Sequence, residues 1–190
     1  MIKIGILGDI GSGKSYVARC FGYPVFNADK EVGKLYKNNL KVFKKLKKTL
    51  PKFIYSFPIS KNEIRRAILC NKSNLKKIVK IVHQEVRKKM NTFLKENKKK
   101  KFVILDIPLL LENKINKKED ILVYVESKKS DIFKRLKNRN NFNIELHRKF
   151  KNIQLPLSYK KKKSKFIIKN DFTNKSVKRG IKIILRQIEI

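Results

Sequence analysis

The chain has 190 residues, enough for one compact domain with a small inserted lobe, and its 41% of apolar residues exclude wholesale disorder. It carries 50 Lys and Arg against 15 Asp and Glu, which gives a net charge of +35. No apolar run could span a bilayer, no signal-peptide pattern opens the chain, and two cysteines with two histidines are too few for a disulfide framework or a zinc site, so we expect a soluble cytoplasmic protein.

Short apolar runs alternate with helical patterns in the first part of the chain. Residues 2–7 predict a buried strand, residues 8–13 a glycine-rich loop and residues 14–21 a helix. Residues 24–27 predict a second strand, after which a helical stretch begins near Asp29. The order strand, loop, helix, strand is typical of the start of a parallel α/β sheet.

The middle of the chain is predicted to be mostly helical. Residues 51–59 contain two prolines and resist helix formation. Ser60 followed by Glu63 is a capping-box signature, which predicts a helix through about Cys70. Residues 74–97 form the longest helical pattern, with apolar residues along a single stripe.

The last part of the chain returns to alternating strands and helices. Residues 102–107 and 121–125 predict strands, and residues 129–139 predict a helix between the second of these and the next strand. A final strand is predicted at 165–168 and a final helix at 174–189. The whole pattern predicts an α/β fold with a parallel sheet of about five strands and helices on both faces.

Two regions are too long to be simple connections between strands. The helical region 37–98 and the polar, loop-prone region 140–164 are predicted to be excursions over one edge of the sheet. The lysine runs at 98–101 and 160–163 predict solvated turns or helix ends.

The chemistry-bearing motif lies at residues 8–15, GDIGSGKS, which satisfy the P-loop pattern G-x-x-x-x-G-K-[ST] between a predicted strand and a predicted helix. Glycines let such a loop wrap around phosphates, with its amides pointing inward. Lys14 would place its charge on the β- and γ-phosphates, and the Ser15 hydroxyl would ligate Mg²⁺. The structural alternative is a glycine-rich turn without function. Asp9 puts a carboxylate inside this loop, which is unfavourable for nucleotide binding.

A P-loop alone predicts the binding of a nucleoside triphosphate and leaves the reaction open. At this length the candidates are a small-molecule kinase, a nucleotide kinase, or a small GTPase or ATPase. The chain has no NKxD segment that would select guanine, which disfavours a GTPase.

Further ordered blocks run along nearly the whole chain. They are GDIGSGKS at 8–15, NAD at 27–29, IRRAIL at 64–69, His83, IPLLLE at 107–112, KRLKNR at 134–139, Gln154 and FIIKN at 166–170. In order and spacing these blocks resemble the dephospho-coenzyme A kinase family. The resemblance implies a P-loop nucleotide-kinase-like sandwich that uses ATP and Mg²⁺ to phosphorylate the ribose 3′-hydroxyl of dephospho-coenzyme A, the last step of coenzyme A synthesis.

The resemblance also implies how the single domain of residues 1–190 is organised. Its core would comprise about 1–36, 99–139 and 165–190. A helical lobe at about 37–98 would bind the acceptor, and a short lid would lie at about 140–164.

The resemblance assigns general-base catalysis to Asp29, which matches a family aspartate beside the acceptor hydroxyl. The structural alternative is an N-cap for a helix that begins at Lys30. Asn27 replaces the family's first aspartate in the same segment, so this chain has one carboxylate there where the family has two.

Arg139 matches the arginine of the family's mobile lid and, with Lys14, would stabilise charge on the transferring phosphoryl group. Its structural alternative is a helix-end arginine that binds carbonyls, and Arg135 is a lesser candidate from the same helix. Asn170 fits the family's segment near the adenine pocket, but Asp171 and Phe172 follow it where the family's glycine is expected. The nucleotide contacts implied by the resemblance are Gly11, Ser12, Gly13, Lys14, Ser15, Tyr16, Arg139 and Asn170.

On the acceptor side, Arg65 matches a family arginine that could clamp a phosphate, whereas Arg66 would point to another face. His83 matches the family's His-Pro pair with Gln84 in place of proline, and a packed helix histidine is an equal alternative. Acceptor contacts implied by the resemblance are Asp29, Arg65, His83, Pro108, Leu109 and Glu112. Asp106, at a strand end, could instead bind Mg²⁺ through water.

Two other functions stay open beside the kinase of dephospho-coenzyme A. One is a nucleoside or nucleotide kinase of the P-loop class, and the other is a basic P-loop protein that binds nucleic acid. The 41 lysines are dispersed and only 9 residues are arginine, which favours AT-rich codon usage over selected polyanion binding. We therefore expect ATP and dephospho-coenzyme A as partners, no membrane or nucleic acid, and a monomer or weak homo-oligomer.

Overall fold

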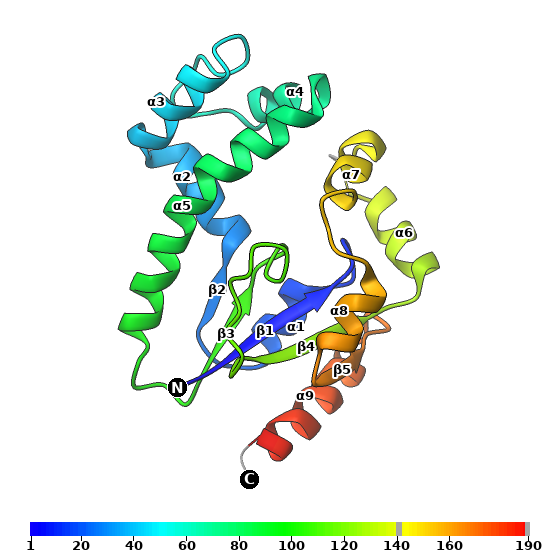
Figure 1. Ribbon diagram of the computed structural model, residues 1–190. Coiled ribbons are helices and arrows are strands. Elements are labelled where there is room, and N and C mark those ends of the chain that lie inside the picture. Colours follow the sequence, from blue (N-terminus) through cyan, green and yellow to red (C-terminus); the bar gives the residue numbers. More distant parts are fainter. Residues whose placement is uncertain (140–141, 189–190) are drawn as a thin grey trace. The chain divides into compact units, whose positions relative to one another are not determined.

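The structure is a computed structural model in which residues 1–139 and 142–188 are described (Figure 1). The chain divides into two compact units. The first comprises Met1–Asn27, Asn97–Phe142 and the chain from Ile153 onward, and the second comprises Ala28–Glu96 and Asn143–Asn152.

A five-stranded sheet forms the centre of the first unit. Its strands are β1 (Ile2–Gly8), β2 (Val25–Asn27), β3 (Phe102–Asp106), β4 (Ile121–Glu126) and β5 (Phe166–Lys169). They lie in the order β2-β3-β1-β4-β5, and each neighbouring pair is parallel. The five predicted strands and the parallel α/β sheet are confirmed.

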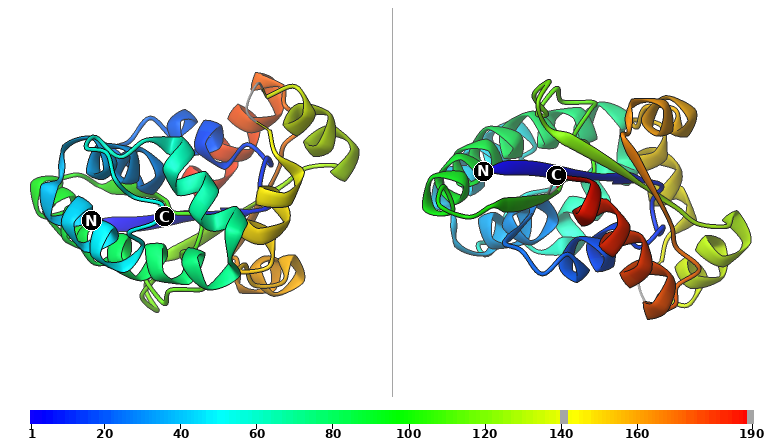
Figure 2. Two further views of the ribbon diagram at one scale, coloured as in Figure 1. Left: turned by 90° about the horizontal axis from the view of Figure 1, so that it is seen from above. Right: turned by 90° about the horizontal axis from the view of Figure 1, so that it is seen from below.

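Helices cover both faces of this sheet, as predicted (Figure 2). The helices of the first unit are α1 (Lys14–Cys20), α6 (Lys129–Lys137), α8 (Leu157–Lys163) and α9 (Asn174–Ile188). Helices α1 and α9 pack on one face, where Ile4 and Ile6 of β1 are fully buried in a core that includes Val17 and Ile181. Helix α8 packs against β1 and β4 from the opposite face.

The second unit is helical where the structure describes it. Its helices are α2 (Ala28–Asn38), α3 (Leu40–Thr49), α4 (Lys61–Cys70), α5 (Lys72–Glu96) and α7 (Ile144–Lys151). The predicted stripe of α5 is confirmed, because Leu75, Ile78, Val82 and Val86 are buried where α5 packs on α2, α3 and α4. The predicted capping box at the start of α4 is also present.

Helix α7 is attached to α4 within the second unit. The Lys149 ammonium donates hydrogen bonds to the carbonyl oxygens of Ile68 and Leu69, at 3.2 and 2.6 Å. These carbonyls lie in the last turn of α4, which has no intrahelical donors for them. A lysine there also complements the negative end of the helix dipole.

The described part of residues 140–164 differs from the loop-prone stretch that was predicted. It contains α7, whose N-terminus is capped by the Asn143 side chain, and α8, which follows Pro156. The predicted lid begins at residues 140–141, which lie outside the described residues, and its remainder is divided between the two units.

Two further expectations need correction. Helix α6 ends at Lys137, so Arg139 lies beyond it rather than in its last turn. Lys160, expected to be solvated, is 1% exposed because its side chain is drawn inward to a buried carboxylate. Within the described residues, no helix is both long enough and apolar enough to cross a membrane.

Candidate active site

The P-loop joins the end of β1 to the start of α1, as its sequence predicts. Gly8 has φ 147°, and a Cβ there would lie 2.7 Å from the carbonyl oxygen of Val125 in β4. Gly13, the N-cap of α1, has φ 90° in the left-handed region. Both positions therefore require glycine, one for a close approach and the other for its backbone conformation.

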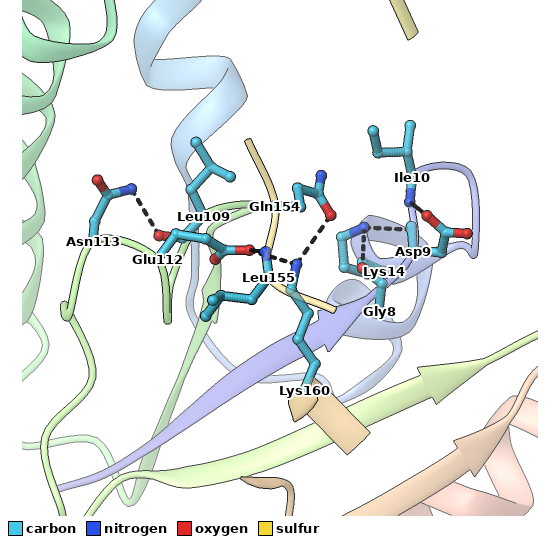
Figure 3. Close-up of polar contacts among 10 residues, drawn as sticks. All are labelled: Gly8, Asp9, Ile10, Lys14, Leu109, Glu112, Asn113, Gln154, Leu155 and Lys160. Atoms are coloured by element: carbon cyan, nitrogen blue, oxygen red, sulfur yellow. Dashed lines mark hydrogen bonds and ion pairs between the residues drawn. The ribbon is translucent and has the colours of Figure 1, made fainter. Parts of the chain in front are cut away.

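The start of α1 offers hydrogen-bond donors to an anion. The Tyr16 and Val17 amides donate to the Gly13 carbonyl oxygen at 3.0 Å. The amides of Lys14 and Ser15, at the first two positions of the helix, have no acceptor one turn before them, and Gly13 has no side chain to cap them. The Lys14 ammonium bends back over the loop and donates to the carbonyl oxygens of Gly8 and Asp9, at 3.2 and 2.6 Å (Figure 3). Positive charge and backbone donors thus meet at one loop, as phosphate binding requires.

The Asp9 carboxylate turns onto the loop itself. Its Oδ1 accepts a hydrogen bond from the Ile10 amide at 2.7 Å. One carboxylate oxygen is therefore engaged by the backbone, while the negative charge stays within the phosphate-binding loop (Figure 3).

Asn170 supports the P-loop from the end of β5. It is 2% exposed, and its amide donates to the Ser12 carbonyl oxygen at 2.8 Å. The Ser127 hydroxyl donates to the same oxygen at 3.1 Å. A Cβ at Gly13 would overlap the Asn170 amide, so the loop and this side chain are closely packed. The structure therefore places Asn170 against the loop backbone.

The carboxyl ends of β2 and β3 bring Asn27 and Asp106 together. The two residues are paired in the parallel register, and the Asn27 amide donates to the Asp106 carboxylate. Asp106 is 2% exposed. An aspartate at position 27 would set two carboxylates side by side, whereas the asparagine supplies a donor instead.

Oxygen donors suited to Mg²⁺ are present at this edge of the sheet. Ser15 lies in the first turn of α1, and Asp106 ends β3, the strand next to β1. No group of three or more His, Cys, Asp or Glu that could hold a metal occurs among residues 1–139 and 142–188. Mg²⁺ does not need such a cluster, because it commonly takes one or two protein oxygens together with water and substrate phosphates.

Glu112 forms a buried charged contact that the sequence did not predict (Figure 3). Its Oε1 accepts from the Lys160 ammonium at 2.8 Å and from the Leu155 amide at 2.9 Å. Lys160 also donates to Gln154 Oε1 at 3.0 Å. The Glu112 and Lys160 side chains are 9% and 1% exposed, and Glu112 Oε2 is buried without a hydrogen-bond partner among the described residues. We call these four residues the Glu112–Lys160 cluster.

The segment between β3 and this cluster is anchored by apolar packing. Leu110 is fully buried, against the position where Gly5 leaves room for its side chain. Pro108 and Leu109 are partly exposed, and the Asn113 amide donates to the Leu109 carbonyl oxygen at 2.8 Å. Pro108 and Leu109, two of the predicted acceptor contacts, thus lie on a turn that is anchored by a buried leucine and a hydrogen bond.

Asp29 lies in the first turn of α2 in the second unit and is exposed. Because α2 begins at Ala28, Asp29 is inside the helix, and the N-cap alternative is wrong. His83 lies partly buried on α5.

Arg65 and Arg66 line a single surface depression of the second unit, of about 510 Å³, together with Tyr55, Ser60, Asn62 and Leu69. The expectation that Arg66 points to another face is therefore wrong. The Arg66 guanidinium donates to the Tyr55 hydroxyl and lies over the ring, 5.7 Å from its centroid.

Arg139 is exposed beyond the end of α6, where its amide donates to the Leu136 carbonyl oxygen at 3.2 Å. Arg135, on α6, lies over the ring of Phe172, with its guanidinium carbon 4.3 Å from the ring centroid. Tyr16 is 37% exposed on α1. Of the predicted nucleotide residues, the structure brings Asn170 and the P-loop into direct contact.

A family model and the curated relatives that match this chain carry the same family name. The family model of dephospho-CoA kinase matches residues 2–176. The dephospho-CoA kinase of Wolbachia pipientis wMel is 31% identical over 192 residues, covering 98% of each chain. A solved structure from Thermus thermophilus superposes with a TM-score of 0.77 at 26% identity, covering 98% of this chain and 97% of that one. The dephospho-CoA kinase of Campylobacter jejuni superposes with a TM-score of 0.61 at 21% identity over 98% and 96% of the two chains, which supports the fold alone.

Proposed function

Since this chain belongs to the dephospho-CoA kinase family, we propose that it transfers the γ-phosphoryl group of ATP to the ribose 3′-hydroxyl of dephospho-coenzyme A, which completes coenzyme A. A member of this family is a kinase and hence a transferase. The match of the dephospho-CoA kinase family model to residues 2–176 supports this acceptor best, and the P-loop between β1 and α1, with Lys14, supports ATP as the phosphoryl donor.

Binding of ATP is divided among residues of the first unit. The first-turn amides of α1 bind phosphate oxygens, and Lys14 exchanges the loop carbonyls for the β- and γ-phosphates. Ser15, and Asp106 through water, would hold Mg²⁺, which would neutralise phosphate charge. Asn170 acts as a positioning residue, because its amide holds the Ser12 carbonyl of the loop.

The transfer step uses Asp29 and Arg139. Asp29 accepts the proton of the 3′-hydroxyl while the hydroxyl oxygen attacks the γ-phosphorus. A bond forms between that oxygen and phosphorus, and the bond from the γ-phosphorus to the bridging oxygen breaks, so that ADP leaves with the electron pair. Arg139 stabilises the negative charge on the transferring group.

The acceptor binds through its phosphates and its apolar part. Arg65 and Arg66 bind phosphate oxygens, for which a planar guanidinium is well suited. His83, Pro108 and Leu109 contact the remainder of dephospho-coenzyme A. Glu112 is a further acceptor-binding residue, and because its Oε1 is bound by Leu155 and Lys160 it also positions the turn that carries Pro108 and Leu109.

The proposal extends to the organisation and setting of the chain. Residues 37–98 serve as the acceptor lobe and residues 140–164 as a lid. The protein works in the cytoplasm as a monomer or weak homo-oligomer, and it has no nucleic-acid partner because its many lysines are dispersed and its arginines few.

The decisive experiment offers Mg-ATP with dephospho-coenzyme A, AMP, CMP or a panel of nucleosides to the purified protein. We expect a much higher kcat/KM for dephospho-coenzyme A, and no product from an acceptor that lacks the 3′-hydroxyl. Lys14→Ala serves as the control that the activity belongs to this chain. Comparable turnover of AMP or CMP would instead make the protein a nucleotide kinase.

A further inference from the structure

Phe172 occupies a backbone conformation that a phenylalanine rarely adopts. It follows β5 and has φ 66°, in the left-handed region that favours glycine. Its amide donates to Asn170 Oδ1 at 2.9 Å. On the other side, the Asp171 carboxylate accepts from the Thr173 amide at 2.9 Å and from the Ser176 hydroxyl at 2.5 Å. Hydrogen bonds on both sides therefore hold the strained residue in place.

The ring of Phe172 lies beside the P-loop. Its Cε1 would be 3.5 Å from a Cβ built on Gly13, the residue that caps α1. The Arg135 guanidinium covers the ring at 4.3 Å from the centroid. Arg135 is itself fixed relative to the loop, because Ile132 and Leu136 of the same helix pack against Gly11.

A nucleobase must lie close to this place if the P-loop holds a nucleoside triphosphate. The phosphates bind at the start of α1, and a single ribose separates the α-phosphate from the base. Partly exposed rings and planar guanidinium groups bind bases by stacking, because every base has a π face. Residues with strained backbone conformations cluster at active sites and ligand-binding sites, where the side chain itself contributes to binding.

We propose that Phe172, backed by Arg135, is the stacking surface for the nucleobase of ATP. The proposal rests on the nucleotide site of the proposed function and adds a residue that sets affinity for the base. It also accounts for a phenylalanine at a position where a glycine would remove the strain.

The test separates contact with the base from contact with the phosphates. A non-hydrolysable ATP analogue and inorganic tripolyphosphate are titrated with Mg²⁺ into the wild type, Phe172→Gly and Phe172→Asn. Glycine and asparagine both tolerate positive φ and lack a ring. The matched control is Phe133→Asn, which removes an exposed ring on α6 that lies under the Lys137 ammonium at 4.7 Å.

We expect both Phe172 variants to bind the ATP analogue about 5- to 150-fold more weakly, from the usual strength of base–aromatic stacking. Tripolyphosphate should bind all four proteins equally. The thermal midpoint of the unliganded Phe172 variants should not fall, because relief of the strained backbone offsets the lost ring contacts. Phe133→Asn should bind both ligands as the wild type does.

Two results would overturn the proposal. Unchanged or tighter binding of the ATP analogue would mean that the ring is not a stacking surface. A parallel loss of tripolyphosphate affinity, or a midpoint lower by several degrees, would mean that the ring only supports the loop. These titrations contain no dephospho-coenzyme A. Failure to phosphorylate dephospho-coenzyme A in a separate assay would overturn the proposed function but would not affect the role of Phe172 in binding the base.

Discussion

Glu63 is fully buried and the Glu112 side chain is mostly buried, but the two carboxylates are stabilised in different ways. In the second unit, Glu63 accepts hydrogen bonds from the amides of Tyr55, Ser56 and Ser60 and from the Ser56 hydroxyl, so both of its oxygens are engaged. In the first unit, Glu112 depends on the Lys160 ammonium and the Leu155 amide, and its second oxygen is left without a partner.

Glu63 is bound by residues close to it in the sequence, whereas Glu112 joins segments that are far apart in the sequence. The donors to Glu63 all lie within eight residues of it, so they close a loop and cap α4. Glu112 instead links the turn after β3 to α8 through its ion pair with Lys160. Figure 3 shows this contact in the same view as the P-loop. Removing a charge should therefore have different consequences at the two sites.

The largest effect is expected for Lys160→Met, which leaves the Glu112 charge buried without its partner. We expect the free energy of unfolding to fall by about 3–5 kcal/mol, measured by urea denaturation at pH 7. Lys162→Met, an exposed lysine of the same run, is the matched control and should change stability by less than about 0.5 kcal/mol.

The double variant Glu112→Gln/Lys160→Met sharpens this prediction. It replaces the ion pair by neutral side chains of similar volume, so most of the lost stability should return. If Lys160→Met unfolds as readily as the wild type, or if the double variant is no better than the single one, the ion pair is not what holds these segments together.

Glu63→Gln is expected to have the next largest effect. A neutral amide presents only one acceptor oxygen to donors that now surround two, and we expect a loss of about 2–3 kcal/mol in the free energy of unfolding. Glu96→Gln, an exposed residue at the end of α5, is the control. No second substitution should restore the stability of Glu63→Gln, because three of the donors to Glu63 are backbone amides. Full recovery through one partner variant would mean that Glu63, like Glu112, depends on a single side chain.

The pH dependence of stability gives a further test of Glu63. Burial alone would raise the pKa of this carboxyl, but hydrogen bonds from Tyr55, Ser56 and Ser60 outweigh it and lower the pKa from 4.5 to about 2. Because the folded pKa lies below the unfolded one, the contribution of Glu63 is fully present above about pH 4.5 and is lost as the pH falls through about 2. The stability difference between wild type and Glu63→Gln should therefore shrink over that window, and a difference that is constant down to pH 2 would contradict the assignment.

The smallest effect is expected at Asp9, whose negative charge would repel the phosphates of a bound nucleotide. Asp9→Asn keeps an oxygen acceptor for the Ile10 amide and removes the negative charge from the P-loop. We expect ATP to bind about 2- to 5-fold more tightly, with a gain that shrinks as salt is added. Calorimetric titration at two salt concentrations measures this, and weaker binding would mean that the charge itself orders the loop.

Features encoded in neighbouring residues could be predicted from the sequence. The P-loop needs only glycines, a lysine and a serine at fixed spacing, and the capping box needs only Ser60 and Glu63. The strands were predicted for a similar reason, because each is a short apolar run bounded by turn residues.

Features that depend on distant residues could not be predicted. Lys160 lies in a run of four lysines, and nothing in that run indicates which one turns inward to a carboxylate after β3. Helices α7 and α8 were not predicted because their sequences are polar, although Asn143 was an available N-cap signal for α7. Arg65 and Arg66 differ in direction by about 100° on a helix, which is compatible with one wide depression.

The features of Phe172 could be predicted from the sequence only in part. The missing glycine after Asn170 was visible in the sequence, but only the fold reveals the positive φ and the place of the ring beside Gly13 and Arg135.

We propose that the exposed Asp29 is the carboxylate that takes part in the reaction. Its role is tested by measuring the turnover of Asp29→Asn with dephospho-coenzyme A together with the ATP dissociation constant of this variant. The substitution keeps the shape of the side chain and removes the base. We expect an ATP dissociation constant close to that of the wild type and a kcat lower by about 10²–10⁴-fold. Turnover within a few-fold of the wild type would contradict it, and Asp106 would then be the next carboxylate to test.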